Sequence, residues 1–196
     1  VERDYTTALE MAGKINLYNE ARKDIDKQMT EQAEDLVRHL PDLEQRRAIV
    51  VYNKEWHKGV IGIVASRLTE QYYRPAVVLT ESEGVATGSA RSVSGFDVYK
   101  AVADCSDLLE NFGGHTYAAG LSLKVENVEA FTERFEAYVE KHILDEQTQA
   151  SLDIDAVLDF KDINFGFYKQ LRRFSPFGPD NAKPLFCTKH VYDYGT

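Results

Sequence analysis

The chain has few cysteines and no long apolar run. Its 196 residues include 2 cysteines, Cys105 and Cys187, which lie far apart and form no Cys-x-x-Cys pair. This usage fits a reducing compartment and excludes a disulfide framework, a zinc motif or a redox motif. No apolar stretch approaches the ~20 residues that a membrane-spanning helix needs, and residues 1–17 lack the charged-then-apolar order of a signal peptide. We expect a cytoplasmic protein with no membrane partner.

Positive charge is also scarce. The chain carries 23 Lys and Arg against 32 Asp and Glu, a net charge of −9, and much of the acidic excess lies in residues 126–146. Non-specific binding of nucleic acid depends on Lys and Arg that neutralise phosphates. The balance therefore argues against a generally basic binding surface, but it permits a local basic pocket.

The chain has enough apolar residues for a packed core, with 43% hydrophobic and 11% aromatic residues. Apolar periodicity predicts alternating strands and helices. The expected strands are 48–52, 75–80, 85–91 and 116–125, and the expected helices are 59–72, 96–112 and 126–146. Gly113 is expected to end the helix 96–112 in a left-handed turn. This order predicts an α/β fold, with a mixed sheet and flanking helices.

The two ends of the chain differ from this middle part. Residues 14–40 have apolar positions at helical spacing and precede Pro41, which predicts a long charged helix that could connect two domains. Beyond residue 150, the segments SLDIDAVLDF and LFCTKHVYDY alternate like strands around a short helix and a Pro/Gly/Asn loop. Two strands and a helix make a poor domain alone. We expect a linker-helix region at 1–46, a main domain at 47–148 and a truncated β-rich module at 149–196.

The first motif with chemical potential is WHKGVIGIVASRL, residues 56–68. It places Trp56 and His57 before a helix whose first turns contain Gly59 and Gly62. A helix N-terminus can hold an anion, and the glycines would let a ligand or another segment come close. The alternative is that small residues let the helix pack tightly on the sheet, with Trp56 in the core. Packing is favoured for the apolar run, and both interpretations stay open for His57.

The second motif is GSARSVSGFD, residues 88–97. Ser89 offers a hydroxyl, and Arg91 offers a planar fork that suits two phosphate oxygens. The alternative is an ordinary strand–turn–helix connection, with Ser94 or Asp97 near the helix cap and Arg91 in a surface ion pair. The local sequence alone slightly favours this alternative.

The third motif is FGGHTYAAGL, residues 112–121. Gly114 and His115 exceed what a helix-ending turn requires. Adjacent glycines let backbone N–H groups converge on an anion, and a histidine can donate to a phosphate or leaving oxygen. Three small residues after Tyr117 leave room above the sheet. The alternative is a histidine that is simply a satisfied core residue at the start of a strand.

Together, the motifs predict three small-residue loops at successive strand–helix junctions, where open α/β sheets form ligand crevices. Ser89, Arg91 and His115 in one crevice would make a pocket for a phosphate or nucleotide.

Hydrolysis of a phosphodiester additionally needs a group that generates the nucleophile, usually paired metals. Asp24 and Asp26 lie on the charged helix, and Asp153 and Asp155 on one face of a strand, without a further ligand at suitable spacing. We expect both pairs to lie on solvated faces. The residues therefore predict phosphate recognition without a metal site.

These motifs, in this order and spacing, closely resemble the DHH-associated domain of the RecJ family of single-strand-specific exonucleases. The preceding helix resembles the linker that joins this domain to the catalytic DHH domain. The segment SPFGPDNAKPLF, residues 175–186, resembles the opening of the family's oligonucleotide-binding barrel. The resemblance covers nearly the whole chain.

The resemblance implies a parent enzyme that hydrolyses single-stranded DNA from its 5′ end, with manganese or magnesium, in recombination and repair. The family's metal ligands lie in the DHH domain, so no metal is expected in this chain. The chain alone is expected to bind nucleic acid without hydrolysis. The implied partners are single-stranded DNA and its phosphate groups, with single-strand-binding protein as a further candidate.

The resemblance also implies roles for individual residues. Gly113, Gly114 and His115 match the Gly-Gly-His motif, which faces the metal site and contacts the substrate phosphate, so His115 is the catalytic candidate. Ser89 and Arg91 match positions that contact the DNA 5′ phosphate or backbone.

Two further residues match a family motif without a defined role. These are Trp56 and His57, which we include as substrate-binding candidates. The family also often has one more glycine where this chain has Phe112, which weakens any role for a backbone donor at that position.

Two other functions stay open at this point. One is a phosphodiesterase of the wider DHH superfamily that acts on short oligonucleotides or cyclic dinucleotides. The barrel-like C-terminal segment counts against it, because long single strands are bound by such modules. The other is a non-catalytic nucleic-acid-binding module.

Overall fold

The computed structural model describes residues 4–192 and divides the chain into two compact units, Val1–Ala150 and Ser151–Thr196. The first unit contains a five-stranded sheet. In spatial order its strands are β1 (Ile49–Tyr52), β2 (Ala76–Ser82), β3 (Val85–Arg91), β5 (Ala118–Lys124) and β4 (Leu109–His115). Strands β1 and β2 are parallel and the other pairs are antiparallel, which confirms the predicted mixed sheet.

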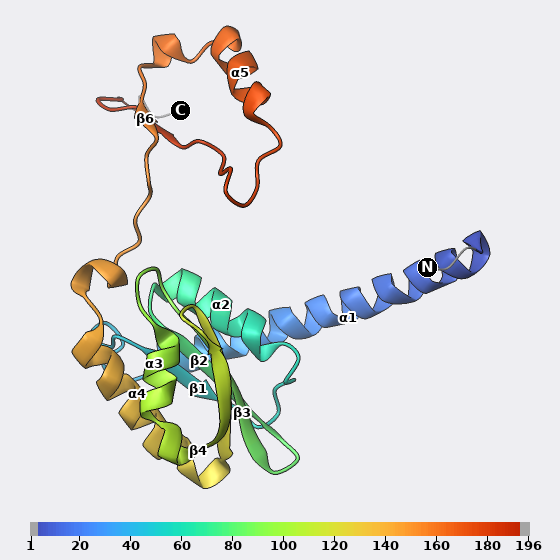
Figure 1. Cartoon of the computed structure of the whole chain (residues 1–196), viewed down its shortest axis with the longest axis vertical. Helices are drawn as coiled ribbons and strands as arrows, with labels where there is room; N and C mark the ends of the chain where they lie inside the picture. The colour runs from blue at the N-terminus through green and yellow to red at the C-terminus, as the bar shows by residue number, and fades with distance from the viewer. Residues whose placement is uncertain (1–3, 193–196) are drawn as a thin grey trace. The chain divides into compact units, whose positions relative to one another are not determined.

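Helices flank both faces of this sheet (Figure 1). Helix α2 (Ile61–Tyr72) and the second half of α1 (Tyr5–Arg38) pack on one face, while α3 (Val98–Asp104) and α4 (Val128–His142) pack on the other. Strands β1 and β2 contribute to both cores. Strands β3 and β5 contribute only to the core under α3 and α4. On their other face, β3 and β5 add no buried side chain to the core under α1 and α2.

Helix α1 begins earlier than the sequence predicts. The side chain of Asp4 caps it by accepting bonds from the backbone N–H groups of its first turn. In its second half, the side chains of Met29 and Val37 are buried. Asp26, which we expected on a solvated face, is only 5% exposed and forms an ion pair with Arg67 of α2 at 2.7 Å. That expectation is wrong for Asp26, because the acid ties α1 to α2.

The predicted helix 96–112 is also wrong in its second half. Helix α3 ends at Asp104, and strand β4 begins at Leu109. Gly113 therefore lies inside a strand and ends no helix. The backbone of β4 pairs with β5, and Phe112 lies 5.8 Å from the ring of Tyr99 on α3. Apolar residues that imitate a helical stripe thus belong to an edge strand.

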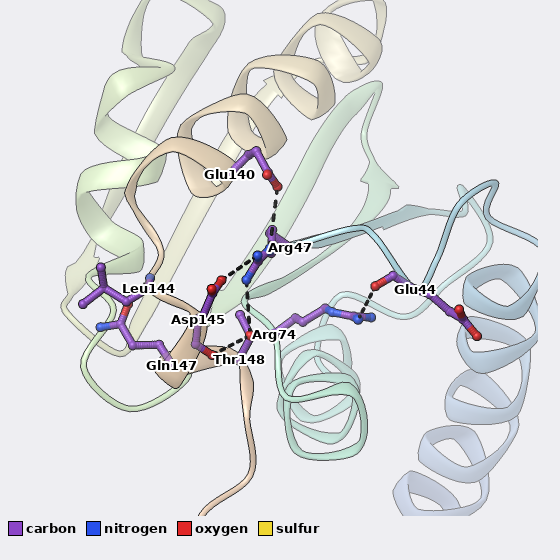
Figure 2. Close-up of polar contacts among 8 residues, drawn as sticks. All are labelled: Glu44, Arg47, Arg74, Glu140, Leu144, Asp145, Gln147 and Thr148. Carbon is purple, nitrogen blue, oxygen red and sulfur yellow. Dashed lines mark hydrogen bonds and ion pairs between the residues drawn. The ribbon is translucent and has the colours of Figure 1, made fainter.

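The first unit ends in a short 3-10 turn that is held by one arginine. The turn η3 (Asp145–Thr148) contacts Arg47, which forms an ion pair with Asp145 at 2.6 Å and donates to Thr148 (Figure 2). Figure 2 also shows Arg74, which donates to the backbone carbonyl oxygen of Glu44. The start of β1 and the end of the unit are therefore joined. The other 3-10 turns are η1 (Ser106–Leu108), η2 (Val125–Asn127), η4 (Phe160–Asp162) and η5 (Arg172–Phe174).

The second unit has little regular structure. It contains helix α5 (Phe165–Leu171) and two parallel strands, β6 (Ala156–Val157) and β7 (Phe186–Cys187). Within the described residues the long strands expected here are wrong, since each observed strand has two residues, and residues 193–194 of the second segment lie outside the described part. Among residues 151–192 no side chain is buried. Within the described residues, no helix is both long and apolar enough to cross a membrane.

Candidate phosphate-binding site

The second and third motifs meet on one face of the sheet. Gly120 of β5 pairs with Ser89 of β3 on one side and with Gly113 of β4 on the other. Two residues earlier on β5, Ala118 pairs with Arg91 of β3 on one side and with His115 of β4 on the other.

We call these two sets of paired residues the Ser89 row and the Arg91 row. Residues that lie opposite each other across a sheet point to the same face. The backbones of Arg91 and His115 are two strands apart, or about 10 Å. Arg91 and His115 thus share one face of the sheet, on strands β3 and β4, and a common crevice lined by both stays a prediction. The expectation of loops at strand–helix junctions is wrong for Ser89, Arg91 and His115, which lie within strands, and right for the first motif, which begins between β1 and α2.

Arg91 is the charged group at the centre of this face. Its side chain is half-buried, and Nη1 donates to Ser89 Oγ and to the Ala90 carbonyl oxygen, each at 2.8 Å. No acidic side chain in residues 4–192 forms an ion pair with it, so the surface ion pair considered from sequence is not found. Burial lowers the pKa of Arg91, but a guanidinium stays charged at neutral pH. An oriented guanidinium without an acidic partner suits an oxyanion.

Helix α2 begins against this arginine. A Cβ atom added to Gly62, the second residue of α2, would lie 2.9 Å from Arg91 Nη2 and 3.2 Å from Ser89 Oγ. The N-cap residue of α2, Val60, has no side-chain capping bond. The positive end of the helix dipole therefore adds to the charge of Arg91. Sequence reasoning singled out Gly62 as a point of close approach, but it did not include this residue in the site.

His115 stands at the exposed end of β4. Its Nδ1 accepts a bond from the Tyr117 backbone N–H at 3.3 Å. A neutral ring with this bond carries its proton on Nε2, which is then a hydrogen-bond donor. Gly113 and Gly120 would meet nothing within 4 Å if they carried a Cβ atom. They line a shallow, largely apolar hollow, to which Ser89, Arg91 and His115 do not contribute.

Gly114 serves the backbone of this strand. Its φ of +155° is unfavourable for other residues, and an added Cβ atom would lie 2.2 Å from the Ala118 carbonyl oxygen. The glycine pair thus divides its roles. Gly114 permits the strand to pair, and Gly113 leaves space above it.

Trp56 and His57 of the first motif do not join these rows, whereas Gly62 of the same motif lies against Arg91 and Ser89. Trp56 is 4% exposed and donates from Nε1 to Gln32 Oε1 at 2.8 Å, which agrees with the packing alternative. His57 is exposed, and its Nδ1 accepts from the Gly59 backbone N–H at 3.1 Å. In the described part of the chain, neither side chain has a polar contact with the two rows.

The described residues offer no divalent-metal site of their own. Between residues 4 and 192, no group of three or more His, Cys, Asp or Glu side chains could hold a metal ion. The polar side chains of the two rows, Ser89, Arg91 and His115, are hydrogen-bond donors of the kind that phosphate oxygens accept.

Two family models match the chain. One, described as the DHHA1 domain, matches residues 45–141, and one described as the RecJ OB domain matches residues 154–194. Known proteins agree. The single-stranded-DNA-specific exonuclease RecJ of Bacillus subtilis is 37% identical over 186 residues, which are 94% of this chain and 23% of that protein. The protein of the same name from Escherichia coli is 31% identical, over 90% of this chain and 32% of its own length.

Solved structures agree with the sequence matches. RecJ from Thermus thermophilus in complex with Mn²⁺ superposes with a TM-score of 0.83 and 27% identity, covering 95% of this chain and 27% of that one. The same protein in complex with Mg²⁺ gives a TM-score of 0.82 over 94% of this chain. This chain thus spans about a quarter to a third of the length of its relatives, between 23% and 32% for the two curated proteins above. It belongs to the RecJ family and comprises a DHHA1 domain and a RecJ OB domain.

Proposed function

We propose that this chain is the substrate-binding part of a metal-dependent exonuclease that hydrolyses single-stranded DNA from the 5′ end in recombination and repair. Arg91 and Ser89 bind the 5′ phosphate or an adjacent backbone phosphate. The observation that carries this proposal is the half-buried guanidinium of Arg91, which Ser89 orients and no described acid neutralises. Such charge-assisted, forked bonds are stronger than neutral ones.

His115 and the glycines of the Ser89 row complete the proposed site. The exposed Nε2 of His115 donates to a phosphate or leaving oxygen of the substrate. The bare surface over Gly113 and Gly120 lets the sugar–phosphate backbone lie close to the sheet. Fixed donors that match a developing charge lower the barrier of a reaction without reorganisation.

The remaining parts of the exonuclease lie in regions that are not part of this chain. We propose that manganese or magnesium is held by the DHH domain of the whole protein and that this chain alone binds DNA without hydrolysis. Residues 1–46 would serve as the linker region, residues 47–148 as the substrate-binding domain, and residues 149–196 as part of the oligonucleotide-binding domain. We assign Trp56 to packing against α1. A substrate contact by His57 and binding of single-strand-binding protein remain predictions.

The test compares oligonucleotides that differ only at the 5′ end. The 196-residue chain should bind a 5′-phosphorylated single strand more tightly than the 5′-hydroxyl strand, as measured by fluorescence anisotropy. Arg91→Ala should remove this difference and weaken binding by about 10- to 100-fold, because it loses a bond to a charged group. Equal binding by both proteins would contradict the proposal.

Two further arms address the reaction itself. No cleavage is expected when Mn²⁺ and a long single strand are added to the purified chain, and robust cleavage would overturn the assignment of hydrolysis to another domain. Tighter binding of a dinucleotide than of a long strand would favour a small-nucleotide phosphodiesterase instead.

A further inference from the structure

Gly62 of α2 lies against the side chains of both Arg91 and Ser89. The contact crosses from α2 to β3, between residues that are far apart in sequence. A Cβ atom at Gly62 would approach Arg91 Nη2 to 2.9 Å and Arg91 Cζ to 3.7 Å. The guanidinium of Arg91 therefore occupies the space that a side chain at this position would fill.

The backbone of α2 does not itself require glycine at this position. The positive-φ glycines of the described chain are Gly84, Gly95 and Gly114, so Gly62 has a conformation open to any residue. Glycine is also a poor helix former compared with alanine. The rest of the helix consists of residues with better helix propensity, including Ala65 and Leu68. The requirement for glycine thus comes from the neighbouring arginine.

The neighbour that would have to move is a flexible one. At Gly62 the closest atoms are the end of the Arg91 side chain and the Ser89 hydroxyl. At Gly88, by contrast, a Cβ atom would lie 2.5 Å from Leu79 Cδ2 in the core. A methyl group at Gly88 would disturb core packing, whereas a methyl group at Gly62 would displace the guanidinium and leave the helix in place.

We infer that Gly62 is a positioning residue for Arg91. Its missing side chain seats the guanidinium between Ser89 and the first turn of α2, where the fork and the helix N-terminus face the same oxyanion. This inference rests on the proposed role of Arg91 in phosphate binding, and it adds the residue that sets the geometry of that contact.

The test uses Gly62→Ala and a matched control, Gly13→Ala. Gly13 lies inside α1, and an added Cβ atom would meet nothing within 4 Å. Both substitutions improve helix propensity and should raise the Tm of the 196-residue chain, by roughly 2–4 °C. Only Gly62→Ala should weaken binding of the 5′-phosphorylated strand, by about tenfold, and reduce its advantage over the 5′-hydroxyl strand. A more stable protein that binds less well cannot be explained by damage to the fold.

A double-substitution cycle separates this inference from the proposed function. If Gly62 acts through Arg91, then Gly62→Ala should have no further effect on binding in an Arg91→Ala background. An equal loss in both backgrounds would overturn the positioning role, as would unchanged binding or a lowered Tm in Gly62→Ala. If Arg91→Ala itself leaves binding unchanged, the phosphate site fails, and the positioning role fails with it. If only Gly62→Ala is silent, the phosphate site stands without it.

Discussion

Strands β3 and β4 carry the two halves of the candidate site in different surroundings. Strand β3 lies inside the sheet between β2 and β5, with alternate residues buried in the core. Strand β4 lies at the edge, and six of its seven residues are exposed. Arg91 is held by two hydrogen bonds and a helix, whereas the ring of His115 has one weak local bond.

The difference suits β3 and β4 to different steps of the proposed reaction. A guanidinium that is oriented before the substrate arrives loses little conformational freedom on binding, so β3 suits recognition of the ground state. The exposed imidazole of His115 can change its orientation when substrate binds over the sheet, so β4 suits a hydrogen bond that forms only in the closed complex. Four experiments can break or sharpen this comparison.

The largest effect is expected from the backbone of β4. Gly114→Ala places a Cβ atom against the Ala118 carbonyl oxygen in a conformation with positive φ. Because backbone atoms cannot move aside, we expect the free energy of unfolding to fall by about 2–3 kcal/mol. Urea denaturation measures it. Gly113→Ala, one residue away with open space above it, should change this free energy by less than about 0.5 kcal/mol. Similar losses of unfolding free energy in both variants would show that the pairing of β4 with β5 has no special requirement for glycine at position 114.

The next largest effect is expected from Arg91 in a whole exonuclease that contains this chain. Arg91→Ala should raise KM by about 10- to 100-fold with little change in kcat, since the contact is made in the ground state. Steady-state cleavage of a 5′-phosphorylated strand measures both constants. Arg22→Ala, which removes an exposed charge on α1, serves as the charge-matched control. A fall in kcat at constant KM would assign Arg91 to the transition state and break the comparison.

Local patterns predicted much of this architecture. The alternation of strands and helices, and hence the mixed sheet, follows from apolar periods that each element carries within itself. The candidate residues could also be identified from sequence, because Ser89, Arg91 and His115 are polar or cationic side chains within stretches of small residues. The structure shows only that the three residues share one face of the sheet, and their roles stay predictions.

What failed depends on contacts between distant segments. Leu108, Leu109 and Phe112 have helical spacing, and only pairing with β5 makes β4 a strand. The seat of Arg91 depends on Gly62, which precedes β3 by a whole helix and strand.

In the second unit, the alternating segments predicted long strands, but residues 151–192 bury no side chain that could fix them. Strand propensity largely expresses packing against neighbours, so the pattern alone could not settle the outcome.

A smaller effect is expected from His115. His115→Ala in the whole exonuclease should lower kcat by about fivefold, which corresponds to the loss of one hydrogen bond of ~1 kcal/mol, and should leave KM unchanged. His115→Gln keeps an N–H donor and should recover part of the rate. Single-turnover cleavage isolates the chemical step. A raised KM with normal kcat would place His115 in the same role as Arg91, and the division between the strands would be lost.

The smallest effects are expected from the ion pairs that support each strand from outside. Arg47 holds the turn η3, whose Gln147 side chain lies against Gly95, just after β3. Arg134 pairs with Asp107, just before β4. Because the acidic partners are exposed, either alanine substitution should cost less than about 1 kcal/mol of unfolding free energy.

The two ion pairs nevertheless support different strands, and hydrogen exchange can separate them. Arg47→Ala should speed exchange in residues 92–97 and 144–148 and leave residues 109–115 unchanged. Arg134→Ala should speed exchange at the start of β4 and leave the loop after β3 unchanged. Since surface pairs act locally, each substitution should loosen only its own strand end. Faster exchange in both regions from either substitution would mean that β3 and β4 open as one unit. The two strands would then differ in their side-chain contacts and not in the stability of their backbones.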